Sequence, residues 1–257
     1  MNALHLRFPL LLLTALLLLP ACQTNPIHSN PNKIEKQIES HYRLGLDALN
    51  KNNLPKAFKE LLYAESLDPK RSEVLDALGY AWQLRGDLNK SLTYYKRAIA
   101  NQPTARTYNN YGTLLLAMNK AEKAEAAFRK ALDDPRYNRP DYAYINLGDA
   151  LLMQDKFNDA IAAFRQARLL NPYQELSRLK EAAAYQQYKR PAFAKAMYET
   201  ILRDSPGNRP ALESLLPLLK AEHKTAEARR QLQTFIKRSS EPLDQAWATE
   251  TLKAIDQ

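Results

Sequence analysis

The sequence predicts an all-α protein in which helix pairs stack into a superhelix. The first observation is that small residues, aromatic residues and prolines recur with a period of about 34 residues, which indicates repetition of one supersecondary unit. The second is that few segments alternate apolar and polar residues as a half-buried strand would. The third is the presence of only six glycines in 257 residues. Together these observations favour stacked helices over a sheet.

Residues 1–21 have the composition of a cleaved targeting segment. Arg7 is their only charged residue, and the apolar stretch that follows is interrupted by prolines. It is shorter than the roughly 20 apolar residues that span a bilayer comfortably. Leu19-Pro20-Ala21-Cys22 resembles the lipobox of bacterial lipoproteins, in which the cysteine is acylated and becomes the new N-terminus. We therefore expect a lipid on Cys22.

Cys22 is the chain's single cysteine, so it cannot form an internal disulfide. Ordinary secretion, with Cys22 a chance residue near the cleavage point, is the alternative to lipidation. In the lipoproteins that the lipobox resembles, an aspartate after the cysteine favours the inner membrane. Gln23 stands there instead, which implies the outer membrane. Residues 22–35 contain two prolines and few apolar side chains, and they predict a flexible tether.

The chain is basic, with a formal net charge of +9, and removal of residues 1–21 with Arg7 leaves +8. Residues 174–240 contain 13 Lys or Arg and 7 Asp or Glu, which supplies +6 of that charge. An exported protein rarely meets nucleic acid, so no nucleic-acid partner is expected. An acidic lipid, a cell-wall polymer or an acidic protein surface fits the charge better. A solvated helical face without a partner is the simpler explanation.

The repeats start at about residue 36, and four kinds of position define them. In each unit a glycine is followed by a small residue, then by leucine or an aromatic residue, and then by alanine, with the same spacing every time. The four sets are Gly45, Gly79, Gly112 and Gly148; Ala57, Ser91, Ala124 and Ala160; Leu61, Tyr95, Phe128 and Phe164; and Ala64, Ala98, Ala131 and Ala167. This order resembles the tetratricopeptide repeat, a helix–turn–helix unit of about 34 residues.

Each unit is expected to pair a helix A with a helix B. Close crossing needs a residue without bulk, so Gly45 of helix A should meet Ala57 of helix B in repeat one. The second alanine lets helix B lie against the next helix A, and the leucine or aromatic residue fills the space between. Prolines such as Pro69 and Pro103 end helix B, because proline lacks an amide donor and clashes with the preceding turn.

Two further repeats and a last helix complete residues 36–257. The fifth repeat, from about Glu175 to Pro206, keeps the alanine and tyrosine positions, whereas the sixth is degenerate, with Leu216 in place of glycine. Glu241 to Gln257 predicts a helix that covers the last repeat. The expected architecture is a superhelix of about six repeats with a C-terminal capping helix.

No motif for catalysis or metal binding is present. The histidines have no second histidine or cysteine at metal-ligand spacing, and the chain has no glycine-rich phosphate loop, GxSxG or HExxH. We therefore expect no enzymatic activity, no cofactor, no metal and no small-molecule substrate. A hydrolase site hidden in the groove is the remaining enzymatic alternative.

A role in binding proteins follows, and the repeat positions indicate where. In tetratricopeptide arrays the A helices line the concave face, on which peptide ligands lie. The positions that correspond to this face here include Tyr42, Leu46, Leu49, Tyr80, Asn109, Asn110, Leu116, Ile145, Asn146 and Leu152. We predict that a partner docks on these residues.

Two parts of this face have alternative explanations. Tyr42, Leu46 and Leu49 form an apolar stripe that a partner could bury, although Ile34–Ser40 could fold over it, or it could be core. The amides of Asn109, Asn110 and Asn146 could hold a peptide backbone, since an amide both donates and accepts. They could equally make a capping or interhelix hydrogen bond. A clamp for a C-terminal carboxylate is not expected, because among these inward positions Arg106 alone is basic, and Asp76 and Asp149 oppose it.

A more particular resemblance rests on the lipobox, the short polar tether, the six repeats, NNYG in repeat three and the long connection DDPRYNRPDYAYINLG. Together they resemble the PilF/PilW type IV pilus biogenesis lipoproteins over nearly the whole mature chain. The resemblance implies a pilotin on the periplasmic face of the outer membrane, which helps secretin subunits reach that membrane and multimerise. The alternative is an adaptor for cell-wall synthesis or outer-membrane protein assembly.

Overall fold

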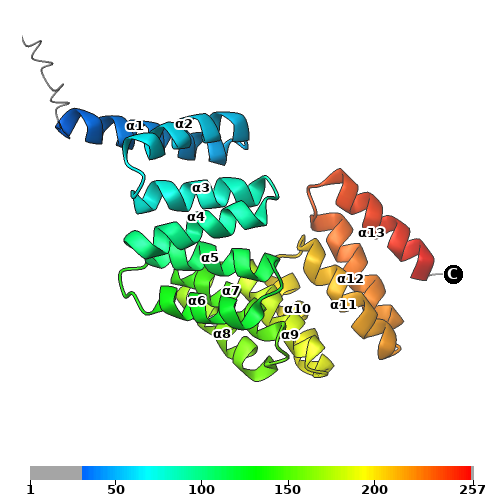
Figure 1. Ribbon diagram of the computed structural model, residues 1–257. Coiled ribbons are helices and arrows are strands. Elements are labelled where there is room, and N and C mark those ends of the chain that lie inside the picture. The colour runs from blue at the N-terminus through cyan, green and yellow to red at the C-terminus, as the bar shows by residue number, and fades with distance from the viewer. Residues whose placement is uncertain (1–30, 256–257) are drawn as a thin grey trace, which may run out of the picture.

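The computed structural model describes residues 31–255, which form thirteen α-helices and no strand (Figure 1). The helices are α1 (Pro31–Asn50), α2 (Leu54–Leu67), α3 (Ser72–Leu84), α4 (Leu88–Asn101), α5 (Ala105–Ala117), α6 (Ala121–Leu132), α7 (Pro140–Leu152), α8 (Phe157–Leu170), α9 (Glu175–Gln187), α10 (Pro191–Asp204), α11 (Arg209–Ala221), α12 (Thr225–Arg238) and α13 (Pro242–Ile255). The odd-numbered helices from α1 to α11 are A helices, and each is followed by its B helix. The predicted six pairs and final helix are confirmed.

The pairs stack in chain order, and the stack curves. In the view of Figure 1 the pairs from α1 to α8 follow one another downward, and α11–α13 lie to the side of α3–α7. Each A helix from α3 to α11 contacts the B helix before it as well as its own B helix. Successive A helices from α1 to α9 also contact one another. They therefore form one continuous face.

The glycines of the A helices meet the large side chains of the B helices. A Cβ atom added at Gly45, Gly79, Gly112 or Gly148 would come within 3.0 Å of the leucine or aromatic side chain of the same repeat, which is Leu61, Tyr95, Phe128 or Phe164. The side chain nearest to a Cβ on Gly45 is thus Leu61, whereas the sequence predicted Ala57. The glycine is needed because a large side chain, and not a small one, crosses helix A at this point.

The small residues of the B helices are all buried. Both sets have 0% of their surface exposed, namely Ala57, Ser91, Ala124 and Ala160, and Ala64, Ala98, Ala131 and Ala167. They allow each B helix to lie close to the helices on both sides, so that the core extends from one repeat to the next.

The turns follow two rules. Every turn from an A helix to its B helix contains one residue with a left-handed φ between 54° and 86°, namely Asn52, Gly86, Asn119, Asp155, Lys189 or His223. Four B helices end two residues before a proline, at Pro69, Pro103, Pro172 and Pro206. The predicted role of proline in ending helix B is therefore confirmed at these positions.

Helix α1 begins before the expected first residue of the repeats. Residues 31–35, which the sequence assigns to the tether, are helical, and Ile34 packs against the first core cluster. Ile38 is 4% exposed within that cluster. Ile34–Ser40 therefore extends α1 and does not fold over the apolar stripe.

The expected signal segment and Cys22 lie outside the residues that the structure describes. Within residues 31–255, no helix combines the length and the apolar character that crossing a membrane requires.

Helix α13 covers the end of the array. Ala248 is fully buried, and the Trp247 ring meets the Phe235 ring of α12 edge-on at 5.8 Å. The Arg209 guanidinium of α11 lies over Trp247 at 4.7 Å and donates to Asp244 at 2.9 Å. The predicted cap is thus held by apolar and ionic contacts.

Candidate docking surface on the A helices

We call the surface formed by α1, α3, α5, α7 and α9 the A-helix face. Side chains join its helices directly, since Arg106 of α5 donates to the Tyr42 hydroxyl of α1 at 3.0 Å. Lys180 of α9 donates to both carboxylate oxygens of Asp149 on α7, at 2.9 and 3.0 Å. All the partner-binding residues predicted from the sequence belong to the first four of these helices.

A charged cluster lies on this face in repeats one to three. The Asp76 side chain is 4% exposed, and its Oδ2 lies 3.2 Å from Nε of Arg106. Asn110 Nδ2 donates to the two Asp76 oxygens at 3.2 and 3.3 Å. Burial raises the pKa of Asp76 to about 6, and Arg106 and Asn110 offset only part of that effect. The charge of Arg106 is therefore committed to Asp76 within the protein.

Two tyrosines that the sequence analysis did not place on the concave face border the cluster. Tyr95 is fully buried, and its hydroxyl has no hydrogen-bond partner among residues 31–255. Burial raises the pKa of Tyr95 well above its usual range, and the charge of Asp76 adds to the rise. Burial also raises the pKa of Tyr137 to about 12, with Arg106 and Asp76 close enough to contribute. The sequence feature that could have pointed to Tyr137 is the unusual length of the connection between α6 and α7, in which it lies.

The amides predicted to hold a peptide backbone are hydrogen-bonded between helices. Asn110 is bonded to Asp76, and Asn146 Nδ2 donates to Oδ1 of Asn109 at 3.0 Å. These contacts are the interhelix hydrogen bonds that the sequence analysis gave as the alternative to binding a peptide backbone. The Asn109–Asn146 pair nevertheless leaves the NH2 group of Asn109 and the side-chain oxygen of Asn146 without a partner in the described part of the chain.

Apolar side chains remain partly exposed toward the C-terminal ends of the A helices. Tyr80 and Leu84 of α3 are 42% and 43% exposed, and Met153, directly after α7, is 47% exposed. Leu46 of α1, Leu116 of α5 and Leu152 of α7 are half-buried. We call this set the apolar strip, and its members are Leu46, Tyr80, Leu84, Leu116, Leu152 and Met153.

Two residues predicted to face a partner belong to the core instead. Leu49 is 7% exposed and packs in the cluster of α1–α3, and Ile145 is 3% exposed and packs in the cluster around α7. An A helix has its B helix behind it and neighbours beside it, so only a narrow stripe of each turn stays open. Neither residue can contact a partner without rearrangement, and we leave both out of the surface proposed below.

The face offers hydrogen bonds and apolar area. Most of its charged groups are paired, and no group of three or more His, Cys, Asp or Glu residues within residues 31–255 could hold a metal ion.

Comparison with known proteins agrees with this architecture. Residues 105–133 and 141–174, which contain α5–α6 and nearly all of α7–α8, match sequence models of the tetratricopeptide repeat. PilF of Pseudomonas aeruginosa has a similar structure, with 22% identity, a TM-score of 0.69, and coverage of 85% of this chain and 99% of PilF. PilW, described as a widely conserved type IV pilus biogenesis factor, has 20% identity and a TM-score of 0.72 over 82% of this chain and 98% of PilW.

The fold is thus a tetratricopeptide-repeat superhelix. A curated sequence relative is an uncharacterized protein of Haemophilus influenzae, 30% identical over 100 residues. The match covers 38% of this chain and 56% of that relative, so the chain spans about half the length of the relative that it matches.

Proposed function

We propose that this protein is an outer-membrane lipoprotein scaffold of type IV pilus biogenesis that acts as a pilotin. In this proposal it binds secretin subunits on its A-helix face, and a lipid on Cys22 carries the complex to the outer membrane, where the secretin multimerises. Similarity to PilF and PilW over nearly their whole length supports the choice of this system. The observation that carries the docking role is the apolar strip.

The strip has the properties of a docking surface. Five of its six side chains lie on helices that contact one another, and the sixth, Met153, directly follows α7; three of the six are more than 40% exposed. Full burial of such a side chain contributes about 1.5–3 kcal/mol, so covering the part that is exposed here contributes about 1 kcal/mol. Several together would offset a useful part of the cost of association.

Polar groups beside the strip suit an extended or helical segment. Asn109 retains its amide donors and Asn146 its side-chain acceptor. One donor and one acceptor at adjacent positions can bond a peptide unit without reading its sequence. The two amides therefore complement the apolar contacts.

The docking test compares two equally exposed leucines, one on an A helix and one on a B helix. Leu84 on α3 is 43% exposed within the strip, and Leu62 on α2 is 42% exposed on a B helix. With secretin coexpressed, Leu84→Glu should reduce the amount of secretin that copurifies with the chain and the amount of secretin multimer. Leu62→Glu adds the same charge at the same exposure and should reduce neither. Equal behaviour of the two variants would remove the A-helix face from the proposal.

The anchoring test is separate. Cys22→Ala should leave secretin copurification intact but move the complex out of the outer-membrane fraction. Mass spectrometry of the wild-type N-terminus should find an acylated cysteine. An unmodified thiol there would refute the anchor. Reversible crosslinking in cells then separates the alternatives, because recovery of cell-wall synthase peptides in place of secretin would favour the adaptor role.

A further inference from the structure

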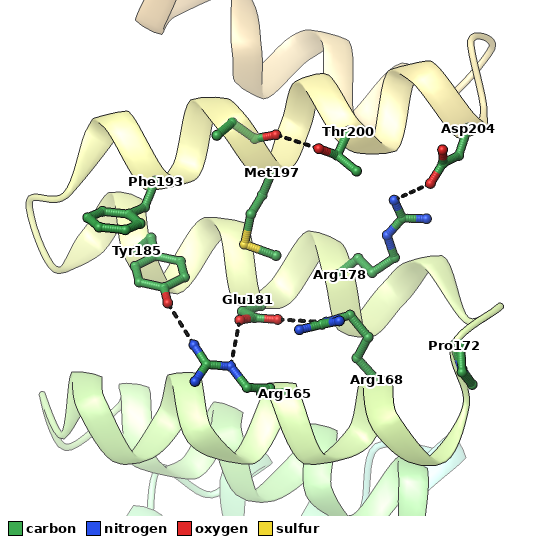
Figure 2. A pocket seen from close by; sticks show the side chains of 11 residues that line it. Arg165, Arg168, Pro172, Arg178, Glu181, Tyr185, Phe193, Met197, Thr200 and Asp204 are labelled. Atoms are coloured by element: carbon green, nitrogen blue, oxygen red, sulfur yellow. Dashed lines mark hydrogen bonds and ion pairs between the residues drawn. The ribbon is translucent and has the colours of Figure 1, made fainter.

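A hollow lies between two B helices. A groove of about 540 Å³ opens between α8 and α10, with α9 as its floor (Figure 2). Arg165 and Arg168 extend from α8, Phe193 lies on α10, and Glu181 and Tyr185 rise from α9 (Figure 2). We call it the α9 groove. Its walls are B helices, and α9 is the one helix that it shares with the A-helix face.

The floor of this groove is charged, unlike the equivalent surface of repeats two to four. Arg178 and Glu181 stand four residues and one residue before the small Ala182. The residues at the same distances before the glycines of repeats two to four are Leu75 and Leu78, Tyr108 and Tyr111, and Tyr144 and Leu147. Leu78 and Leu147 are 0% and 4% exposed, as core residues are. Repeat five therefore has an ion pair network where its neighbours have apolar packing.

Glu181 holds two guanidinium groups over the floor. Its side chain is 3% exposed, and its two oxygens lie 3.4 Å from Nε of Arg165 and 3.1 Å from Nε of Arg168. Arg165 also donates from Nη2 to the Tyr185 hydroxyl at 2.9 Å. A buried carboxylate costs desolvation, and an apolar residue of similar volume is often as stable. The arrangement positions the arginines more than it stabilises the fold.

Arg168 retains free donors. Glu181 occupies its Nε, and neither terminal nitrogen has a hydrogen-bond partner among the residues that the structure describes. Its side chain is 36% exposed. Two terminal N–H groups of one guanidinium match the two oxygens of a carboxylate.

Apolar surface adjoins these donors. Phe193 is 57% exposed and stacks on the Tyr185 ring at 5.3 Å, and Met197 lies next along α10 (Figure 2). Four further large apolar side chains are exposed beside the turn from α8 to α9, namely Leu169, Leu170, Tyr173 and Leu176. The groove thus combines a site for an anionic group with sites for apolar side chains.

We propose that the α9 groove binds an extended acidic peptide segment of a partner protein. A carboxylate of the segment pairs with Arg168, and a neighbouring large apolar side chain packs on Phe193 and Met197. The excess of positive charge over residues 174–240, 13 basic against 7 acidic, complements such a segment. An arginine fork fits both a carboxylate and a phosphate, but the exposed Phe193 beside it favours a peptide, which can place an apolar side chain next to its carboxylate.

The test uses a fluorescein-labelled peptide that alternates aspartate with phenylalanine or leucine, and the full-length chain in detergent micelles. A peptide of roughly ten residues, at about 3.4 Å per residue, is long enough to span the groove. Fluorescence anisotropy gives its Kd. One control peptide has asparagine for every aspartate, and a second has serine for every apolar residue. We expect both to bind at least tenfold more weakly than the parent.

Variants of the chain locate the site. Arg168→Gln and Phe193→Ala should each weaken binding about tenfold. Arg129→Gln is the control for loss of an arginine from a B helix, because Arg129 lies on α6, does not line the groove, and pairs with Glu125 on its own helix. It should leave the Kd unchanged.

Glu181→Leu tests positioning, since it gives this floor the residue found at Leu147 in the preceding repeat. Peptide affinity should fall about tenfold, while the thermal midpoint stays equal or rises. A fall in both would indicate a merely structural role.

A lipid headgroup is the other anionic group that Arg168 could bind. Vesicles of phosphatidylglycerol test it, and vesicles of net-neutral phosphatidylcholine are the control. Equal binding of the aspartate and asparagine peptides would overturn the proposal, and so would an Arg168-dependent affinity for phosphatidylglycerol without peptide binding. No secretin is present in these measurements, so their result is independent of the pilotin proposal.

Discussion

The ring of Phe164 lies against Gly148 so closely that a Cβ atom on the glycine would overlap the ring. Alanine is favoured over glycine in helix interiors by about 1 kcal/mol, whereas overpacking a core costs about 1–3 kcal/mol. Because the fully buried ring of Phe164 has little room to move, we expect the cost of overpacking to exceed the gain in helix propensity. Gly148→Ala should lower the free energy of unfolding, measured by urea denaturation, by up to about 2 kcal/mol.

Gly207→Ala is its control. The nearest atom to a Cβ on Gly207 is the Cα of Ser239 at 3.7 Å, an ordinary contact, and the φ of Gly207 is not positive. The free energy of unfolding should change by less than about 0.5 kcal/mol. If both variants behaved alike, the slot between Gly148 and Phe164 would not explain the glycine.

The turn residues make a second prediction. Gly86 has a φ of +86° and no atom within 4 Å of an added Cβ, so Gly86→Ala introduces backbone strain alone. The expected cost is about 1 kcal/mol. Lys189 occupies the equivalent turn with a φ of 56°. Lys189→Gly should therefore stabilise the chain by a few tenths to about 1 kcal/mol, since relief of strain exceeds the added backbone freedom. Urea midpoints that move in the same direction for both variants would contradict this.

The spacing of small and aromatic residues was sufficient to predict the helix pairs but not the atoms that meet. Ala57 and Leu61 lie about one turn apart along the same side of α2. Periodicity therefore predicts that Gly45 meets this side of the helix, and it cannot choose between the two. The structure selects Leu61, because its side chain is long enough to fill the slot.

The sequence predicted which residues of the A-helix face are open to solvent only to within about one position per helical turn. Leu46 and Leu49 are neighbours on α1, yet Leu46 is half-buried and Leu49 is a core residue. The contact between Arg106 and Tyr42 joins residues 64 positions apart because a long guanidinium side chain crosses α3. Such contacts depend on helix geometry that no sequence period contains. The charged floor at Glu181 was visible in the sequence as a break in an otherwise apolar position.

The buried carboxylate of Asp76 makes stability depend on pH. Its pKa is about 6 in the folded chain and about 3.9 when unfolded, so between these values the folded state binds more protons. Stability from this group is therefore present at low pH and lost as the pH rises through 6. The unfolding free energy of the wild type minus that of Asp76→Asn should fall by about 2–3 kcal/mol from pH 4 to pH 7. Urea denaturation at each pH measures it, and a flat difference would contradict the prediction.

Arg106 supplies an independent check on this carboxylate. Its charge lowers the pKa of Asp76 against the effect of burial. Arg106→Gln should therefore raise the pKa of Asp76 further above 6 and move the pH-dependent window upward. Carbon-13 NMR of the Asp76 carboxyl group would measure this directly. A lower pKa in the variant would show that Arg106 does not act on Asp76 through its charge.

The two tryptophans lie near opposite ends of the array and should affect only their own ends. Trp82 packs on Phe58 at 4.6 Å in repeats one and two, and Trp247 packs on Phe235 at the C-terminal cap. Both are half-buried, so alanine at either should cost about 2–3 kcal/mol, somewhat less than a fully buried tryptophan. In an array where each repeat contacts only its neighbours, the loss stays local. Hydrogen exchange should accelerate in α11–α13 for Trp247→Ala and in α1–α4 for Trp82→Ala. Acceleration along the whole chain in either variant would mean that the repeats unfold as one cooperative unit.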